Sequence, residues 1–263
     1  MLIDILAAAA KTAAPQNSFG LKQALFPEGE PNWIGISTFV ILAIMSFGSF
    51  YILFVKYFEQ NKIMKQAREL QTGFWRAGSL REGANKLDKN SAYRQIVDDG
   101  LAAEEQHGKM TDSMEAHDWL HGSLARSEAS VNARLAGGLP FLASVGATSP
   151  FIGLFGTVVG IYGALINIGI SGSASIDKVA GPVGEALIMT ALGLLVAVPA
   201  VLAYNWLQSR NKRIAETLSG FSTDVLANIN SKGAVRPAAT GPAPKAAAPV
   251  SPRPAAPVST AQA

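Results

Sequence analysis

The sequence predicts an all-α integral membrane protein with three transmembrane helices and long helical extensions outside the membrane. Its apolar residues gather in three blocks and do not form periodic stripes of the kind that line a globular core. Residues 135–176 contain no charged residue, and this run far exceeds the ~20 residues that cross a bilayer core. Between Val179 and Ser209 the only charged residue is Glu185.

Composition excludes several classes of function. The chain of 263 residues has no cysteine, so it offers no disulfide framework, thiolate metal site or thiol nucleophile, and its three histidines leave little for acid–base catalysis. The formal net charge is +3, but most basic residues flank the apolar blocks, as the positive-inside rule requires. We therefore predict no nucleic-acid partner and no cofactor.

The N-terminal segment, residues 1–32, precedes the first apolar block. A cleaved signal peptide would place basic residues before an apolar run, whereas here Asp4 interrupts the apolar start and Lys11 follows it. A signal peptide is the alternative. The pattern favours one or two short amphipathic helices at the outer membrane surface, ending at Pro27 and Pro31.

The first predicted span covers residues 33–55, which carry no charge and are long enough to cross a bilayer as a helix. Trp33 lies at one end, and Tyr51, Tyr57 and Phe58 lie near the other. Such aromatic residues are typical anchors at the two membrane–water interfaces.

The distribution of basic residues predicts the orientation. Residues 56–134 contain 12 Lys or Arg, against 2 in residues 1–32 and 1 between the second and third apolar blocks, and 7 more follow Ser209. We therefore expect a periplasmic N-terminus, a cytoplasmic 56–134 segment and a cytoplasmic C-terminus, which three spans make consistent.

The cytoplasmic segment 56–134 is predicted to be helical. Tyr93, Ile96, Val97 and Leu101 recur at spacings of three and four, which indicates an amphipathic helix. Residues 56–75 should continue the first span beyond the membrane, and residues 110–135 should run directly into the second span.

His117 and His121 stand four residues apart in the sequence HDWLH, which resembles half of a zinc-protease motif. The motif's glutamate is replaced by Asp118, and no third ligand is evident. A charged, solvated helix face is the better interpretation, so we predict no metal site.

The second span, about residues 141–169, carries small residues at heptad intervals that suit close helix packing in lipid. Pro150 should free the carbonyl of Gly146, which a membrane tolerates only where other groups satisfy it. The glycines match no nucleotide-binding spacing. The predicted packing positions are Gly146, Gly153, Gly156, Gly160, Gly163 and Pro150, with Ser149 in the same seam.

Polar residues inside the second and third spans are the candidate functional residues. Thr157 and Thr190 each place a hydroxyl in a long apolar helix, where bonding to the helix's own carbonyls is an equally good explanation. Glu185 at membrane depth is costly unless neutral, paired or hydrated, which favours function, although Pro182 would also place it in a first helical turn. Glu185 and Thr190 should point about 140° apart.

The remaining divisions follow from composition. The predicted core, residues 135–209, contains the second and third spans joined by a short Gly/Ser connection; a cytoplasmic helix covers 210–232. Residues 233–263 hold 11 Ala and 7 Pro with no acidic residue, which is typical of a disordered tail.

The sequences SPFIGLFGTVVGIYGAL and GPVGEALIMTALGLLVAVPAVLAYNWL resemble the core signature of the ExbB/TolQ/MotA proton-channel family, over about residues 135–210. The three-span pattern fits the ExbB and TolQ branches better than the four-span MotA branch. The N-terminal segment and the Pro/Ala tail favour the ExbB branch over TolQ.

The resemblance implies an oligomeric ring, a pentamer, whose second and third helices line a pore around the helix of an ExbD-like single-span partner. It implies a proton-motive-force-driven motor that energises a TonB-like transducer for outer-membrane uptake of siderophores and vitamin B12. The family's pore positions fall on Thr157, Glu185 and Thr190, while Val159 stands where the family often has Trp.

Other functions stay open on the residues alone. A TolQ-like subunit of an envelope-maintenance motor would share the same pore residues. A non-conducting membrane scaffold would tolerate loss of the polar groups, and an enzyme would need a catalytic constellation that only HDWLH approaches. A stand-alone transporter would need internal repeats over more spans.

Overall fold

The computed structural model describes residue 25 and residues 32–110, 115–171 and 176–236. The amphipathic helices expected before Pro31, the Gly/Ser connection at 172–175 and most of the predicted tail lie outside the described residues. Within the described ranges every regular element is a helix. The predicted all-α fold is confirmed.

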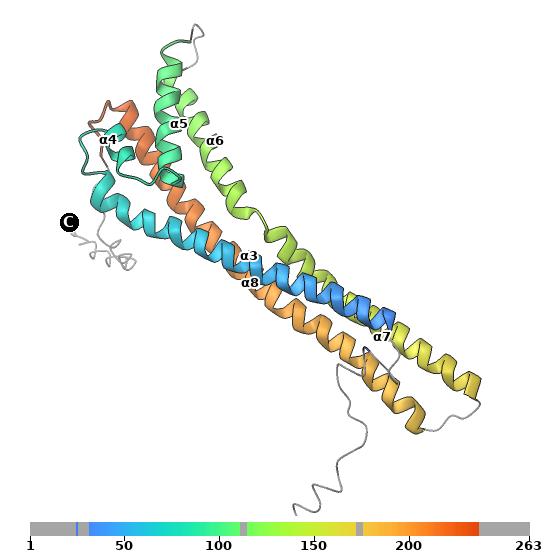
Figure 1. The fold of residues 1–263 in the computed structure, drawn as a ribbon. Helices are drawn as coiled ribbons and strands as arrows, with labels where there is room; N and C mark the ends of the chain where they lie inside the picture. Colours follow the sequence, from blue (N-terminus) through green and yellow to red (C-terminus); the bar gives the residue numbers. More distant parts are fainter. Residues whose placement is uncertain (1–24, 26–31, 111–114, 172–175, 237–263) are drawn as a thin grey trace, which may run out of the picture.

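Three long helices run side by side along most of the molecule (Figure 1). Shorter helices gather at one end of this rod. The elements are α3 (Trp33–Glu69), η2 (Leu70–Phe74), α4 (Leu80–Asn85), α5 (Ala92–His107), α6 (Ala116–Ala136), α7 (Leu139–Ser171) and α8 (Ile176–Asn230).

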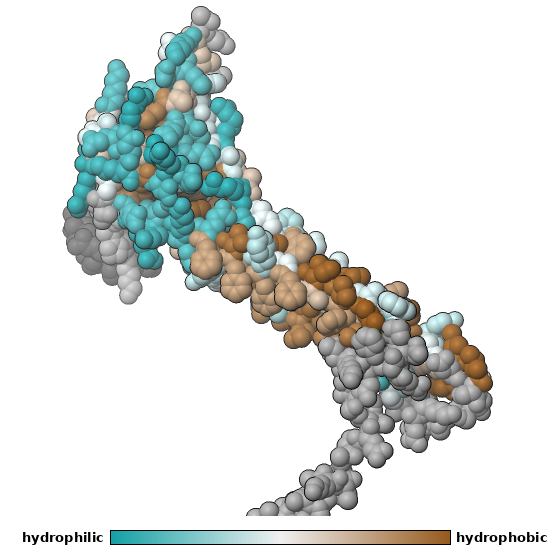
Figure 2. All heavy atoms as spheres, in the orientation of Figure 1, coloured by the Kyte–Doolittle hydropathy of each residue, from teal (hydrophilic) through white to brown (hydrophobic). Residues whose placement is uncertain are grey.

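Parts of α3, α7 and α8 are long and apolar enough to cross a membrane, as the sequence predicts. Apolar side chains cover the surface of this part in Figure 2, and hydrophilic residues cover the opposite end. Phe47 of α3 and Phe151 of α7 are 77% and 70% exposed, and Leu195 of α8 is similarly uncovered. Such exposure is stable only against lipid or another subunit.

The contact between α7 and α8 depends on glycine. A Cβ atom on Gly153 would lie 2.6 Å from the Met189 carbonyl oxygen, and one on Gly193 would lie 2.6 Å from the Ser149 carbonyl oxygen. Both obstacles are backbone atoms, which cannot rotate away. The two helix backbones therefore touch at these positions.

The other predicted packing glycines differ among themselves. A Cβ on Gly146 would collide with Val201, one on Gly160 would lie 3.0 Å from Ala186 Cβ, and one on Gly156 would meet Thr38 of α3. A Cβ on Gly163 would meet no described atom within 4 Å. Pro150 lies inside α7, which continues through it.

The polar end of the molecule, which we call the head (residues 62–136 and 212–236), has its own hydrophobic core. Ile96 and Val97 of α5 are fully buried, and Tyr93 is 1% exposed. They pack with Leu124 of α6 and Leu218 of α8. The helix predicted from this spacing is confirmed, and it runs over Ala92–His107.

The second span does not continue the preceding helix, contrary to our expectation. α6 ends at Ala136, and α7 begins at Leu139. Gly138 has φ +84°, a left-handed conformation that suits glycine, and a Cβ there would lie 3.0 Å from Ile52 Cγ2. Pro140 follows at a position where its missing N–H costs little. The chain therefore bends at Gly137–Gly138.

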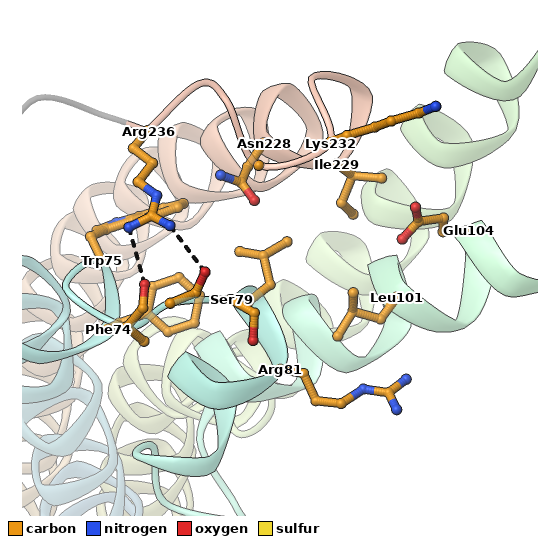
Figure 3. Close-up of a pocket in the computed structure, with 14 residues that line it drawn as sticks. Phe74, Trp75, Ser79, Arg81, Leu101, Glu104, Asn228, Ile229, Lys232 and Arg236 are labelled. Atoms are coloured by element: carbon orange, nitrogen blue, oxygen red, sulfur yellow. Dashed lines mark hydrogen bonds between the residues drawn. The ribbon is translucent and has the colours of Figure 1, made fainter.

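The third span continues without a break into the helix predicted over 210–232, and α8 ends at Asn230. The segment predicted as a tail begins at 233, but its first four residues are described and lie against the head. Arg236 donates to the carbonyl oxygens of Ala77 and Gly78 at 3.1 and 3.0 Å (Figure 3). Asn228 Nδ2 donates to the Val235 carbonyl at 2.7 Å, which fixes the turn.

The glycine contact predicts opposite effects for two matched substitutions. Gly153→Ala should lower the free energy of unfolding by about 1–3 kcal/mol because its Cβ overpacks against backbone. Gly163→Ala, which gains the same helix propensity in open space, should be neutral or stabilising. Thermal unfolding of the purified variants in detergent measures both. Equal effects would contradict the proposed helix contact.

Burial of Tyr93 predicts alkaline destabilisation of the head. Burial raises the pKa of its phenol from 10.0 to about 12. The folded state therefore holds this proton more tightly, so stability is complete below pH ~10 and falls as pH rises toward 12, by about 2 kcal/mol. Unfolding measured from pH 8 to 12 should show a smaller loss for Tyr93→Phe. Identical pH profiles would refute this origin.

Candidate functional site

Two hydroxyl groups meet between α7 and α8 inside the apolar part of the molecule. Thr157 Oγ1 lies 2.5 Å from Thr190 Oγ1. The Thr157 hydroxyl also lies 3.1 Å from the Gly153 carbonyl oxygen and 3.0 Å from that of Ala186. Thr157 is 5% exposed, whereas Thr190 is partly exposed. We call these two residues the hydroxyl pair.

The local sequence explains why the two threonines meet. Thr157 lies one helical turn after Gly153, and Thr190 lies one turn before Gly193. Because Gly153 and Gly193 let the backbones touch, short side chains one turn away can reach across the interface. Larger residues at either glycine would separate the helices beyond hydroxyl contact.

The number of protons limits the hydrogen bonds that the pair can make. Each threonine hydroxyl has one hydrogen to donate and can accept. If Thr157 donates to a carbonyl, Thr190 donates to Thr157 Oγ1. Rotation of both hydroxyls reverses this order without moving either helix. The hydrogen bonds of the pair therefore have two possible directions. The pair is buried on the side of Thr157 and partly exposed, or open, on the side of Thr190.

Glu185 lies on α8 beside the hydroxyl pair. It is partly buried and directly precedes Ala186, whose carbonyl oxygen accepts from Thr157. Helical geometry places the Glu185 side chain about 100° around α8 from Ala186, which faces α7. The structure brings Thr157 and Thr190 into contact and places Glu185 at the flank of the same interface.

Ser149, which we placed in the packing seam, is fully buried and donates to the Val145 carbonyl at 2.6 Å. Sequence reasoning missed other buried hydroxyls in the spans, such as that of Ser49, which donates to the Met45 carbonyl at 2.8 Å. Thr38 of α3 is 3% exposed and contacts the Gly156 position. A hydroxyl in an apolar helix was the available signal, but it does not indicate which helix face is covered.

Sequence reasoning also missed a polar cluster where the spans meet the head. Gln60 of α3 is fully buried and donates to Asn211 Oδ1 of α8 at 2.7 Å. Asn211 Nδ2 in turn donates to the Leu135 carbonyl of α6 at 3.0 Å. These amides stand outside the apolar blocks, and their spacing along the chain carries no sign of the contact.

Two cavities lie in the head, away from the hydroxyl pair. One of about 260 Å³ is lined by Phe74, Trp75 and Leu101 with Arg81 and Lys232 at its edge (Figure 3). Another of about 300 Å³ lies between α5 and α6. Neither cavity contains the residues predicted for the pore.

The histidines of HDWLH lie on one face of α6, with ring centroids 6.4 Å apart. His117 Nδ1 is 2.9 Å from Asn230 Nδ2. Within residues 32–110, 115–171 and 176–236 no group of three or more His, Cys, Asp or Glu side chains could hold a metal ion.

Comparison with known proteins identifies the family of the chain. The model of the MotA/TolQ/ExbB proton channel family matches residues 88–219, a range that contains both threonines and Glu185. It also covers α6, α7 and most of α8, together with the bend at Gly137–Gly138.

Curated relatives match most of the chain. The biopolymer transport protein ExbB of Xanthomonas campestris is 38% identical over 74% of this chain and 79% of its own length. The ExbB protein of Neisseria meningitidis is 35% identical over 76% and 93%. The Tol-Pal system protein TolQ of Haemophilus influenzae is 33% identical over 69% and 82%. The chain is an inner-membrane member of the MotA/TolQ/ExbB proton channel family.

Proposed function

We propose that this chain is the ExbB-like subunit of a motor driven by the proton motive force. With an ExbD-like single-span partner, it energises a TonB-like transducer for outer-membrane uptake of siderophores and vitamin B12. The ExbB names of the Xanthomonas and Neisseria relatives support this choice. The chain itself performs transport work and no enzymatic conversion.

The hydroxyl pair is the observation that carries the proposal. Thr157 and Thr190 place two exchangeable protons between apolar helices, and Glu185 adds a titratable group at the edge of that interface. Polar groups at this depth are costly and are found where ions or protons pass. The open side at Thr190 provides the place where a polar path enters from a lumen.

One acid among three spans does not make a complete proton relay, so a partner must supply another titratable group. A carboxylate on the ExbD-like helix would take up and release protons beside Thr190 and Glu185. Its neutralisation would allow that helix to rotate or shift within the ring. The exposed apolar faces of α7 and α8 provide the surfaces for neighbouring subunits in a ring, which we propose is a pentamer.

The energy available sets a minimum on proton use. One proton crossing ~100 mV releases about 2.3 kcal/mol. Useful mechanical work therefore needs several protons for each event or an additional pH gradient. A ring with a repeated hydroxyl pair satisfies this need because each subunit offers the same path in turn.

We propose a periplasmic N-terminus and a cytoplasmic head. The excess of Lys and Arg in residues 56–134 supports this orientation. An aromatic pair at the head end of the spans supports it as well. Tyr57 and Trp206 stack with centroids 5.8 Å apart, and the Arg210 guanidinium lies 4.7 Å from the Trp206 ring. Aromatic rings with a cation are typical of the cytoplasmic membrane interface.

A TolQ-like role is the second candidate, and the Haemophilus TolQ relative is the observation that favours it. Complementation separates the two roles. An ExbB-like chain, expressed with its own partner, should restore growth on ferric siderophores. A TolQ-like chain should restore resistance to detergents. A chain that restores only detergent resistance would overturn the siderophore assignment.

Proton flux tests the site directly. The chain, co-purified with its small partner and placed in liposomes with the transducer, should conduct protons. Thr157→Val removes a hydroxyl while keeping its shape, and Glu185→Gln removes the charge. Each should reduce flux by tenfold or more, which corresponds to about 1.4 kcal/mol in the barrier. A pH-sensitive dye inside the liposomes measures the rate.

Thr148→Val is the matched control because Thr148 is exposed on α7 and, among the described residues, its hydroxyl donates to the Ser144 carbonyl of its own helix. Its flux should equal that of the native chain. Size-exclusion chromatography checks that each complex assembles. Native flux that survives both Thr157→Val and Glu185→Gln would remove these residues from the path. An assembled native complex without flux would favour a scaffold.

A further inference from the structure

A cluster of polar side chains joins α3, α6 and α8 where the spans meet the head. We call it the joint and define it as Lys56, Glu59, Gln60, Arg134 and Asn211. Gln60 and Asn211, which bond each other, are 151 positions apart in the chain. The joint lies directly beside the bend at Gly137–Gly138, about one helical turn from the start of α7.

The joint supplies partners for the end of α6. The last carbonyl groups of a helix have no N–H donor within that helix. Because the chain bends, α7 does not provide N–H groups in helical register. Lys56 Nζ donates to the Arg134 carbonyl at 2.7 Å, and Asn211 Nδ2 donates to the Leu135 carbonyl at 3.0 Å. Two other helices therefore hold the end of α6, and the Lys56 charge suits the negative pole of its dipole.

Gln60 connects the two helices that hold α6. Its Nε2 donates to the Leu207 carbonyl at 3.0 Å and to Asn211 Oδ1 at 2.7 Å. Asn211 is thus oriented by Gln60 on one side and bonds α6 on the other. Glu59 accepts from Lys56 at 2.8 Å and lies 3.5 Å from Arg134 Nε. The contacts form two neighbouring sets, and each of them reaches the end of α6, at Arg134 and at Leu135.

Stability alone does not explain the choice of Gln60. Its side chain is fully buried, and its Oε1 has no hydrogen-bond partner among the described residues. An unpaired buried acceptor is destabilising, and an apolar residue of similar size would have none. Buried polar contacts of this kind can fix one arrangement of helices among several.

The bend is the part of the chain that needs such control. Two adjacent glycines, Gly137 and Gly138, have few steric limits on φ and ψ, so the angle between α6 and α7 is not fixed by the backbone itself. α6 belongs to the core of the head, through Leu124 and Val131, whereas α7 carries Thr157. The angle therefore decides how the head sits on the pore helices.

We infer that the joint sets the angle of the Gly137–Gly138 bend and transmits movements of the spans to the head. Lys56, Gln60 and Asn211 are positioning residues in this role. The transmission rests on the proposed motor function, but the control of the angle does not. Loss of one joint contact frees α6 relative to α7, while the hydrophobic core of the head and the glycine contact between α7 and α8 stay intact.

Distance measurements test the control of the angle. The native chain has no cysteine, so Ala129→Cys on α6 and Ala147→Cys on α7, both exposed, can be spin-labelled cleanly. In assembled complexes diluted with unlabelled subunits, pulsed electron paramagnetic resonance should give one narrow distribution of the distance between the two labels. Gln60→Leu and Asn211→Leu each remove two hydrogen bonds and should each add a second distance, with at least about a tenfold rise in its population.

Lys56→Gln provides a milder variant if the buried substitutions prevent assembly, because the Lys56 side chain is 12% exposed at the edge of the joint. Gln106→Leu, on the exposed surface of α5, is the matched control and should leave the distribution unchanged. A single narrow distance in assembled complexes of every joint variant that forms would overturn the inference.

Proton flux and growth distinguish control of the bend angle from transmission of movement to the head. Joint variants should retain proton flux in liposomes, because Thr157, Thr190 and Glu185 are unaltered, yet lose most siderophore-dependent growth. Absent flux in the native complex would reject the proposed motor while the distance measurement still decides the joint. Broadened distances with full growth would show that the joint sets the angle but transmits nothing.

Discussion

The backbone contact between Gly153 of α7 and Gly193 of α8 is the constraint on which the apolar half of this protein depends. In a bilayer, apolar side chains gain little by leaving lipid, so helix association relies on close packing and on hydrogen bonds between helices. Both are present here at one level of the interface. The glycines bring the backbones together, and the approach then allows Thr157 to bond the Ala186 carbonyl and to meet Thr190. Packing and polar function therefore share one cause.

The head follows different physics, and the two halves must be connected. Water drives burial of Tyr93, Ile96 and their neighbours, which form the core of the head. The core of the head ends on α6 at Leu135, a separate small cluster begins on α7 at Leu139, and Gly137–Gly138 lies between them. The amides of Gln60 and Asn211 join α3, α8 and the end of α6 at this level. Hydrogen bonds can do so because they are directional both beside lipid and beside water.

Much of the fold could be predicted from the sequence because length and apolar content decide which segments span a bilayer. The helix at Ala92–His107 followed from its spacing, and the threonines followed from their polarity in apolar helices. The bend was missed because a pair of glycines is compatible with both a helix and a break. The break is seen only in the structure, where Gly138 is left-handed and a Cβ on it would press against Ile52. The joint was missed because amides far apart in the chain give no periodic signal. Gly163 shares the heptad spacing, yet it meets no described neighbour within the subunit.

The difference between Gly153 and Gly163 has a consequence for assembly. Small residues on α7 that are not covered by α8 or α3 remain available for close approach by a helix from outside the subunit, where a larger side chain would hold the backbones apart. Gly163 lies ten residues beyond Gly153, toward the end of α7 remote from the head. In the proposed ring, such an uncovered position would let the same helix pack within its own chain and also face a neighbour or a central partner. The glycines therefore divide between holding the subunit together at Gly153 and leaving room for another helix at Gly163.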